Sequence, residues 1–236
     1  MAQNHTISTQ VDKLDIVFAE GKKGKRTRKV ISRSNDRVTR KFPSILEDRM
    51  IYCESELERD AYRIQEVDHS IRSYQEQPAC ITYSIDGDQS QHYPDFLLRT
   101  KQGLVFREIK TEEEANTLEI RRRTEYLSQQ LPFYGYQYEV LTDTTIHQQP
   151  RLKNARFLLR RGRKPVVLQQ YELLRLYAKK KGYLFWGDIV TSKSCPLNVF
   201  EISWLILNGY VKIPMNQRWQ DETPLTLVES TQAKEV

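Results

Sequence analysis

The chain has 236 residues, 39% of them hydrophobic and 29% charged, and a formal net charge of +6. This length allows one large domain or two small ones, and the hydrophobic content is enough for a packed core. No apolar run approaches the roughly 18 residues of a membrane-spanning helix, and the N-terminal residues lack the apolar segment of a secretory signal, so we expect a cytoplasmic protein.

The sequence also lacks the motifs of several enzyme and metal-protein classes. The three cysteines, Cys53, Cys80 and Cys195, are odd in number and far apart, and no Cys/His spacing suggests a zinc site. We expect all three to be reduced thiols. There is no glycine-rich phosphate loop, Ser-His-Asp arrangement or nucleotide fingerprint, so ATP hydrolysis is not expected.

Positive charge is concentrated in a basic arm between residues 22 and 41. The arm contains ten Lys and Arg residues and one acid, Asp36, so its charge is +9 and the other residues sum to −3. Such a segment suits salt-dependent, sequence-independent contact with a phosphate backbone. The alternative is a disordered, solubilising tail, although interleaved apolar residues such as Val30 and Phe42 favour an arm that orders against a surface. The candidate DNA-binding residues are Lys22, Lys23, Lys25, Arg26, Arg28, Lys29, Arg33, Arg37, Arg40 and Lys41.

Apolar spacing predicts a helix and two strands after the arm. Leu57, Ala61 and Ile64 recur at helical spacing, which indicates an amphipathic helix. Residues 71–77 and 81–85 have the composition of strands. An Asp-Gly-Asp turn signal follows the second of these strands.

Two further strands, over residues 92–98 and 104–110, are joined by a short hairpin turn. Side chains two apart on a strand share a face, so Glu108 and Lys110 point the same way, and the neighbouring strand can place Asp95 beside them. Carboxylates suit Mg²⁺, a hard cation that prefers oxygen ligands and activates water near phosphate, while a lysine offsets charge that develops at phosphorus. The alternative for this pair is a solvated face of an edge strand.

Glu58, on the helix that follows Ser55, is a further acidic candidate. Its spacing also makes a Ser-x-x-Glu capping box, in which Glu58 would only bond the backbone amide of the cap, and both interpretations stay open on these residues alone. His92 lies three residues from Asp95 and shares neither its strand face nor a clear metal geometry, so we expect a packed or hydrogen-bonded histidine. The arginines at 121–123 either contact phosphates or form a solvated helix face.

The remaining elements before residue 166 complete the first part of the fold. A second capping box predicts a charged helix over residues 112–130, followed by a strand over 136–141 and a helix over 151–161. Helices around a run of strands indicate an α/β protein with a central mixed sheet flanked by helices. Gly162 and Pro165 mark a basic linker, where we place a domain boundary.

The C-terminal segment, residues 166–236, has the pattern of a winged helix. A helix that ends at Gly182, a short element over 184–190 and a third helix over 197–207 precede two strands around a polar loop. The third helix carries no Lys or Arg, whereas a helix that reads DNA usually has cations there. We therefore favour a structural or protein-contact role for this segment.

Three short motifs together resemble a known family. The runs Ser55–Glu58, His92–Phe96 and Glu108–Lys110, with the basic arm ahead of them and the winged-helix-like tail behind, resemble TnsA, the endonuclease subunit of heteromeric bacterial transposases. The resemblance covers most of the chain and implies a bacterial cytoplasmic protein.

The resemblance also implies a domain plan. A restriction-endonuclease-like nuclease domain would cover residues 45–162, preceded by the basic N-terminal arm at 1–44 and followed by the winged-helix-like domain at 166–236.

Site residues and partners follow from the same resemblance. Glu58 matches the helical acid of the family, Asp95 its central metal ligand, and Glu108 and Lys110 the paired residues on the following strand, where some members have Gln in place of the acid. Glu58, Asp95 and Glu108 would then bind Mg²⁺, for which Mn²⁺ is expected to substitute. The family cuts the non-transferred strands at the 5′ ends of the transposon, with a TnsB-type recombinase acting on the 3′ ends and a TnsC-type ATPase regulator that contacts the C-terminal part.

The leading hypothesis is thus a metal-dependent DNA endonuclease that works within a transposase on double-stranded transposon ends. A self-contained restriction or repair nuclease of the same fold is the second hypothesis, and the lack of an evident base-reading domain argues against it. The third is a non-catalytic DNA-binding scaffold subunit, in which the acidic residues have no catalytic role.

Overall fold

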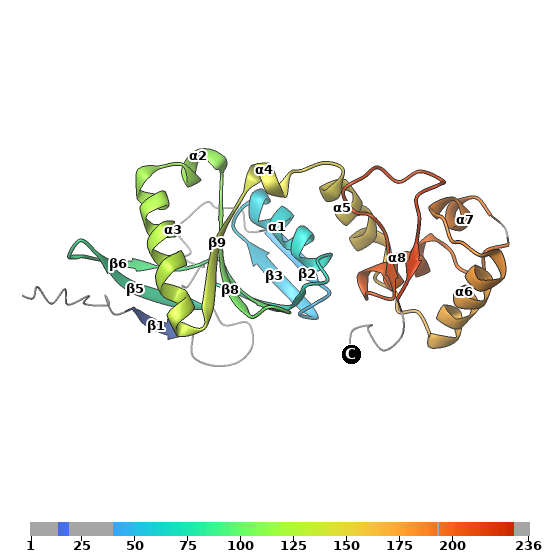
Figure 1. Cartoon of the computed structure of the whole chain (residues 1–236), viewed down its shortest axis with the longest axis horizontal. Helices are drawn as coiled ribbons and strands as arrows, with labels where there is room; N and C mark the ends of the chain where they lie inside the picture. Colours follow the sequence, from blue (N-terminus) through green and yellow to red (C-terminus); the bar gives the residue numbers. More distant parts are fainter. Residues whose placement is uncertain (1–13, 19–39, 193, 229–236) are drawn as a thin grey trace, which may run out of the picture. The chain divides into compact units, whose positions relative to one another are not determined.

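The computed structural model describes residues 14–18, 40–192 and 194–228 (Figure 1). Most of the basic arm, from Lys22 to Arg37, lies outside these residues, and its predicted DNA contacts stay a prediction. Arg40 and Lys41, at the end of the arm, are described and begin a strand.

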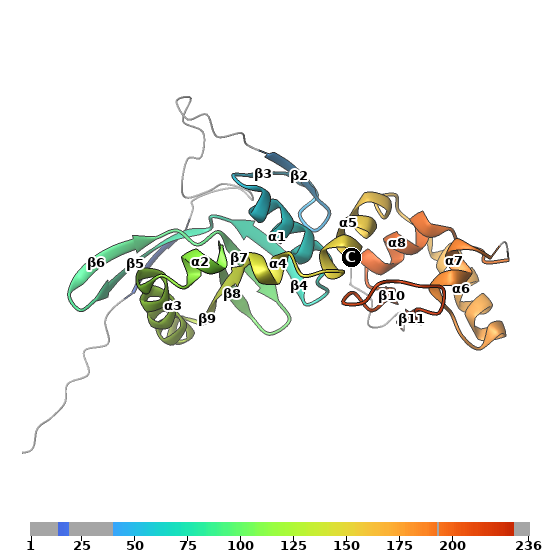
Figure 2. The same cartoon turned by 90° about the horizontal axis from the view of Figure 1, so that it is seen from above.

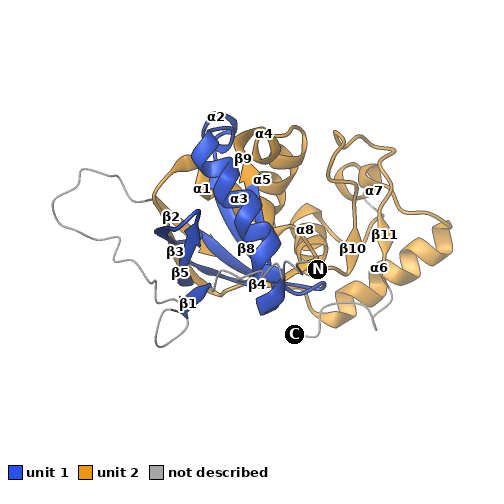
Figure 3. Ribbon diagram, turned by 60° about the vertical axis from the view of Figure 1, so that its left-hand side comes forward, with its two compact units in different colours: residues 1–35, 73–140 blue, residues 36–72, 141–236 orange. Residues whose placement is uncertain are grey.

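The chain forms two compact units, each made of two separate segments (Figure 3). The first unit comprises residues 1–35 and 73–140, and the second comprises residues 36–72 and 141–236. This grouping differs from the predicted domain plan, whose boundaries at residues 44 and 162–166 stay a prediction.

The first unit is built on two sheets. Figure 2 shows β5 and β6 as a long antiparallel ribbon, with Ile81 paired to His92 and Ile85 to Asp88. One sheet has the order β1-β5-β6 and the other β4-β7-β8-β9. The strands are β1 (Asp15–Phe18), β4 (Ile71–Glu76), β5 (Ala79–Ile85), β6 (Asp88–His92), β7 (Phe96–Thr100), β8 (Leu104–Lys110) and β9 (Tyr136–Thr142).

One helix, α3 (Leu118–Gln130), supplies the apolar contacts that bring these sheets together. Leu127 of α3 and Leu131 of the following 3-10 turn η1 (Leu131–Tyr134) are fully buried. They pack in one cluster with Phe106 of β8 and with buried residues of β5 and β9. The core of the first unit therefore lies between α3 and the strands that precede and follow it.

The predicted helix over 112–130 is in fact two helices, α2 (Glu112–Ala115) and α3. The second capping box is confirmed, since the Thr111 hydroxyl accepts from the Glu114 N–H at 3.2 Å and the Glu114 carboxylate accepts from the Thr111 N–H at 3.0 Å. The first of these helices ends at its C-cap Asn116, whose side-chain amide donates to the Glu112 carbonyl at 2.8 Å.

The second unit begins with an antiparallel hairpin that the sequence did not predict, β2 (Arg40–Ser44) and β3 (Arg49–Cys53). Its turn is held by Glu66, at the end of helix α1 (Glu56–Glu66). The buried Glu66 carboxylate accepts from the Ser44 hydroxyl at 2.6 Å and from the Ile45 N–H at 2.9 Å. The sequence analysis assigned residues 40 and 41 to the basic arm and so did not predict this strand. The acid that holds its turn lies far along the chain.

Helix α1 packs against α4 (Asp143–Ile146) and α5 (Arg151–Arg161) of the same unit. Helix α5 also packs closely on α8 (Val199–Leu207). A Cβ atom added at Gly162 would lie 2.7 Å from the Ser203 carbonyl oxygen, so the residues predicted as a linker lie directly against α8.

The C-terminal elements follow the predicted order. Helix α6 (Leu168–Lys181) ends at Gly182, which has the left-handed conformation that favours glycine, and α7 (Trp186–Val190) and α8 come next. Strands β10 (Val211–Lys212) and β11 (Thr226–Leu227) form a two-stranded antiparallel ribbon.

The protein is therefore of mixed α/β class, as predicted. All three cysteines are free thiols, as expected. Among the described residues, no helix combines the length and apolar character needed to cross a bilayer.

Candidate active site

The strand predicted over residues 92–98 is interrupted. β6 ends at His92 and β7 begins at Phe96, and Pro94, which has no N–H to donate to a neighbouring strand, lies in the gap. Antiparallel pairing of Phe96 with Arg107 sets Asp95, the residue before Phe96, opposite Glu108. Asp95 therefore lies opposite Glu108 from a position just before the start of β7.

Asp95 is held by backbone groups on two sides. Its Oδ2 accepts a hydrogen bond from the Ile109 N–H at 2.7 Å, and its carbonyl oxygen accepts from the Gln77 N–H at 2.8 Å. Charge-assisted bonds from backbone N–H groups fix a carboxylate in position. The carboxylate of Asp95 is therefore oriented by the strand that carries Glu108 and Lys110.

Glu108 is almost fully buried, at 4% exposure, and three basic side chains lie beside it. Its Oε1 lies 2.7 Å from Lys110 Nζ and 3.5 Å from Arg123 Nη2, and its Oε2 lies 3.2 Å from His92 Nε2. Burial alone would raise the pKa of this carboxyl, but His92 and Lys110 outweigh it and lower the pKa. The alternative of a solvated edge strand is wrong for Glu108, because β8 lies between β7 and β9.

Lys110 lies closer to Glu108 than Arg123 does. Burial alone would lower its pKa, but the carboxylates of Glu108, Asp95 and Glu114 outweigh this effect, and the net pKa is raised. The ammonium group is therefore charged at neutral pH. It interacts electrostatically with both Asp95 and Glu108, which lie opposite each other at the entrance to β7 and on β8.

His92 is packed and hydrogen-bonded, as the sequence predicted, but it also belongs to the site. It is 5% exposed, its Nε2 lies 3.0 Å from the Tyr138 hydroxyl, and the same nitrogen lies beside Glu108. The sequence argument compared His92 with Asp95 alone and did not predict its contact with Glu108, which lies 3.2 Å away. Desolvation lowers the pKa of His92.

The arginines at 121–123 have different environments. Arg122 is exposed and pairs with Asp86, whereas the side chain of Arg123 is only 12% exposed and faces Glu108. The alternative of a solvated helix face is therefore wrong for Arg123, and contact with phosphates stays a prediction. A sequence signal existed, since Arg123 precedes the buried Leu127 by four residues, which places both on one face of α3.

Glu58 lies in the second unit, at the start of α1. The Ser55 hydroxyl accepts from the Glu58 N–H at 3.0 Å, and the Glu58 carboxylate accepts from the Glu54 N–H at 3.0 Å and from the Ser55 hydroxyl at 3.3 Å. The predicted Ser55 cap is present, although Glu58 bonds the Glu54 amide. Its membership of a metal site with Asp95 stays a prediction.

The donor set of the first unit matches a hard cation. Among the described residues, no group of three or more His, Cys, Asp and Glu side chains is arranged to hold a metal. Asp95 and Glu108 supply two carboxylates, and Mg²⁺ is usually bound by one or two carboxylates together with waters and substrate phosphate. The pair thus fits an ion that keeps most of its water ligands.

The described cations of the basic arm have partners within the second unit. Arg40 Nε lies 3.2 Å from Glu56 Oε2, and Lys41 Nζ lies 5.7 Å from the centroid of the Tyr52 ring. Contact of either residue with DNA stays a prediction.

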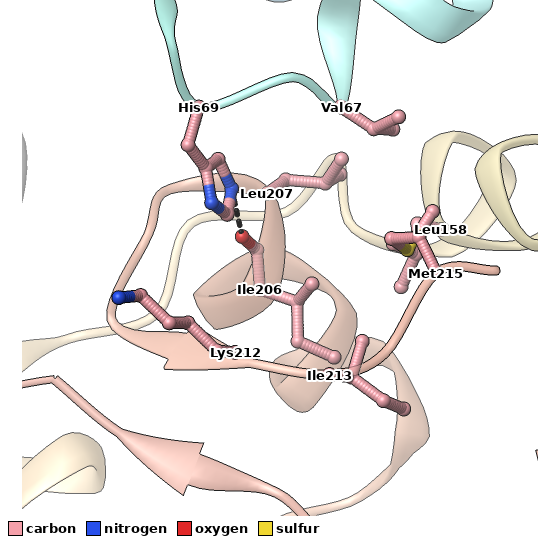
Figure 4. A pocket seen from close by; sticks show the side chains of 8 residues that line it. All are labelled: Val67, His69, Leu158, Ile206, Leu207, Lys212, Ile213 and Met215. Carbon is pink, nitrogen blue, oxygen red and sulfur yellow. Dashed lines mark hydrogen bonds between the residues drawn. The ribbon is translucent and has the colours of Figure 1, made fainter.

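The second unit also contains a small pocket of about 190 Å³ (Figure 4). His69 projects into it and its Nε2 lies 2.8 Å from the Ile206 carbonyl oxygen, near the end of α8. No carboxylate lines this pocket, so it lacks the groups that the proposed hydrolysis needs. Its lining residues are Val67, His69, Leu158, Ile206, Leu207, Lys212, Ile213 and Met215.

Comparison with known proteins gives no assignment for the chain. No protein-family model matches the sequence, and no curated protein matches it significantly. Functional inference therefore depends on the residues of the site.

Proposed function

We propose that the chain is a Mg²⁺-dependent DNA endonuclease subunit of a TnsA-type transposase, which cuts the non-transferred strands at transposon ends. One observation carries this proposal: Asp95 and Glu108 occupy opposed positions on β7 and β8, with the charged Lys110 2.7 Å from Glu108. Two carboxylates and one ammonium group on neighbouring strands are the groups that metal-assisted phosphodiester hydrolysis needs.

Each residue has a distinct role in the proposed reaction. Asp95, oriented by the Ile109 N–H, and Glu108, oriented by Arg123 and His92, would hold the metal ion. A bound Mg²⁺ supplies stabilisation of charge on the phosphoryl oxygens and a water of lowered pKa. Lys110 places a permanent positive charge beside the scissile phosphate, which stabilises the negative charge that develops there.

Cleavage by site variants of the full chain, with Mg²⁺ or Mn²⁺, tests the proposal. Asp95→Ala and Lys110→Ala should abolish strand cleavage, while thermal unfolding shows that the fold survives. The exposed Glu113→Gln and Lys101→Ala, on α2 and in the β7–β8 turn, are matched controls that should keep full cleavage. Undiminished cleavage by Asp95→Ala would exclude a catalytic role for this site.

Direct metal binding separates the nuclease from a non-catalytic scaffold. Mn²⁺ binding measured by electron paramagnetic resonance should be lost on Asp95→Asn, which keeps the size of the side chain and an acceptor for the Ile109 N–H. Equal Mn²⁺ binding by the two proteins would favour the scaffold. Efficient cleavage by the purified chain without partners would instead favour a self-contained nuclease.

We further propose that residues 166–236 contact protein partners of the TnsB or TnsC type. Helix α8 has no Lys or Arg, and its only charged residue is Glu201, which argues against insertion into a DNA groove. Apolar side chains are instead exposed on α6, with Leu168 at 66% and Leu176 at 63%. Exposed apolar surface of this kind favours a protein interface.

A further inference from the structure

Helix α5 and the residues after it are strongly basic. Seven cations and no acid occur from Arg151 to Lys164, and the nearest acids in the sequence are Asp143 and Glu172. The proposed nuclease site does not use this segment, and the predicted DNA contacts lie in the basic arm. The cations are Arg151, Lys153, Arg156, Arg160, Arg161, Arg163 and Lys164.

Three of these cations form a stripe along the exposed side of α5. Lys153, Arg156 and Arg160 are separated by three and four residues, which places them on one helix face, and all three are exposed. The opposite face is apolar, with Leu152 and Leu158 fully buried. The helix therefore packs through one side and presents a row of positive charge about 10 Å long on the other.

The central cation of the stripe is held in place by a buried carboxylate. Arg156 Nη2 donates to both oxygens of Asp60 on α1, at 2.7 and 2.9 Å, while about half of the arginine side chain remains exposed. Asp60 is 1% exposed and also pairs with Arg63. Burial alone would raise the pKa of Asp60, but the bonds from Arg156 and Arg63 lower it. The guanidinium of Arg156 is thus already oriented before any ligand binds.

The outer cations have no such carboxylate. Within the described part of the chain, no ion pair involves Lys153 or Arg160. An anionic surface that approaches α5 can therefore contact both charges without breaking an ion pair among the described residues.

We propose that the stripe of Lys153, Arg156 and Arg160 binds the sugar–phosphate backbone of double-stranded DNA, as a second contact site besides the basic arm. This inference rests on the proposed action on DNA. A duplex carries one phosphate per about 3.4 Å of helix axis on each strand, so a row about 10 Å long spans successive phosphates. Contact of this kind positions the protein without reading sequence.

Charge composition favours DNA over an acidic protein as the ligand. The centres of protein interfaces are depleted in charged residues, lysine among them, and enriched in aromatic residues, Met and Arg. The stripe is cationic along its whole length, and its middle residue is a guanidinium that presents several donors, which suits phosphate oxygens.

DNA binding by the full chain, measured in EDTA so that no strand is cut, tests this site. Lys153→Gln with Arg160→Gln removes the two unpaired charges and leaves the Asp60–Arg156 pair intact. Over about 50 to 200 mM salt, the slope of log affinity against log salt for a short duplex should decrease in magnitude by about two, one for each lost phosphate contact. The matched control is Lys179→Gln with Lys180→Gln, two exposed cations on α6, which should leave the slope unchanged.

An unchanged salt slope in Lys153→Gln/Arg160→Gln, or an equal decrease in the α6 control, overturns the inference. Loss of binding to polyglutamate with DNA binding intact also overturns it and points to an acidic protein.

Cleavage distinguishes this inference from the proposed function. A chain that binds DNA through the stripe and never cuts it supports the inference alone, whereas a chain that cuts DNA with an unaltered slope in the variant supports the nuclease and excludes the stripe.

Discussion

Lys110 Nζ lies 2.7 Å from Glu108 Oε1, two residues away on the same face of β8, and this pair is 25% and 5% exposed in its side chains. At this distance the cation and the carboxylate form an ion pair before any substrate binds. Arg123 and His92 complete the surroundings of Glu108, so one buried acid has both a packing role and a role in the proposed chemistry.

Removal of that acid should destabilise the protein strongly. Glu108→Ala leaves Lys110 and Arg123 without their buried carboxylate, and breaking such a pair costs about 3 to 5 kcal/mol. Glu108→Gln keeps the side-chain volume and one acceptor oxygen, so it should lower the free energy of unfolding clearly less than Glu108→Ala does. Urea unfolding measures both.

The control for Glu108 is an exposed acid with a similar partner. Glu139, whose side chain is 44% exposed, pairs with Arg107 at 2.6 Å, and Glu139→Ala should cost less than about 1 kcal/mol. Equal losses for Glu108→Ala and Glu139→Ala would show that the buried network contributes no more than a surface ion pair.

Acid should weaken the first unit through His92. Its pKa is lowered in the folded protein, so at a pH below its ordinary value of about 6.5 the unfolded chain takes up a proton that the folded chain resists. This contribution is fully present above about pH 6.5 and is lost as the pH falls through the lowered folded pKa. The free energy of unfolding should then decrease by at most about 1.4 kcal/mol per pH unit.

His92→Phe tests this assignment because phenylalanine keeps the ring and cannot titrate. The variant loses the bond to the Tyr138 hydroxyl and should be less stable at pH 7, but its stability should depend less on pH between about 6.5 and 5. Parallel pH profiles for the variant and the unaltered chain would assign the acid sensitivity to other groups.

Local patterns predicted the centre of the candidate site, and long-range packing supplied the rest. Glu108 and Lys110 follow from the two-residue period of a strand, and Asp95 follows from a hairpin with a short turn. His92 and Arg123 come from β6 and α3, and nothing in their immediate sequence specifies which buried carboxylate they meet. The predicted strand over residues 92–98 included Pro94, although a residue without an N–H marks the point where that strand is interrupted.

The difference between local patterns and long-range packing also explains which elements of the fold were predicted. Helices α5, α6 and α8 have strong apolar periodicity or clear caps, and their positions were predicted to within a few residues. The β2–β3 hairpin was missed because its turn is stabilised by Glu66, which lies about 20 residues downstream.

Ser55 and Glu58 allow capping and catalysis to be separated. Ser55→Ala removes the hydroxyl that accepts from the Glu58 N–H, which should cost about 1 kcal/mol in stability and leave cleavage by the folded protein unchanged. Glu58→Gln keeps an oxygen that can accept from the Glu54 N–H, so stability should change little while cleavage is lost. Full cleavage by Glu58→Gln would leave Glu58 as a structural residue only.

Gly162 should be intolerant of any side chain, since the end of α5 packs against the backbone of α8. An added Cβ would lie 2.6 Å from Leu207 Cδ1 and 2.7 Å from both the carbonyl carbon and the oxygen of Ser203. Such overpacking typically costs about 1 to 3 kcal/mol, so Gly162→Ala should lower the urea midpoint of unfolding. Adding Leu207→Ala should not restore stability, because the Ser203 backbone still occupies the space. A change within about 0.5 kcal/mol for Gly162→Ala would show that α5 and α8 separate easily at this point.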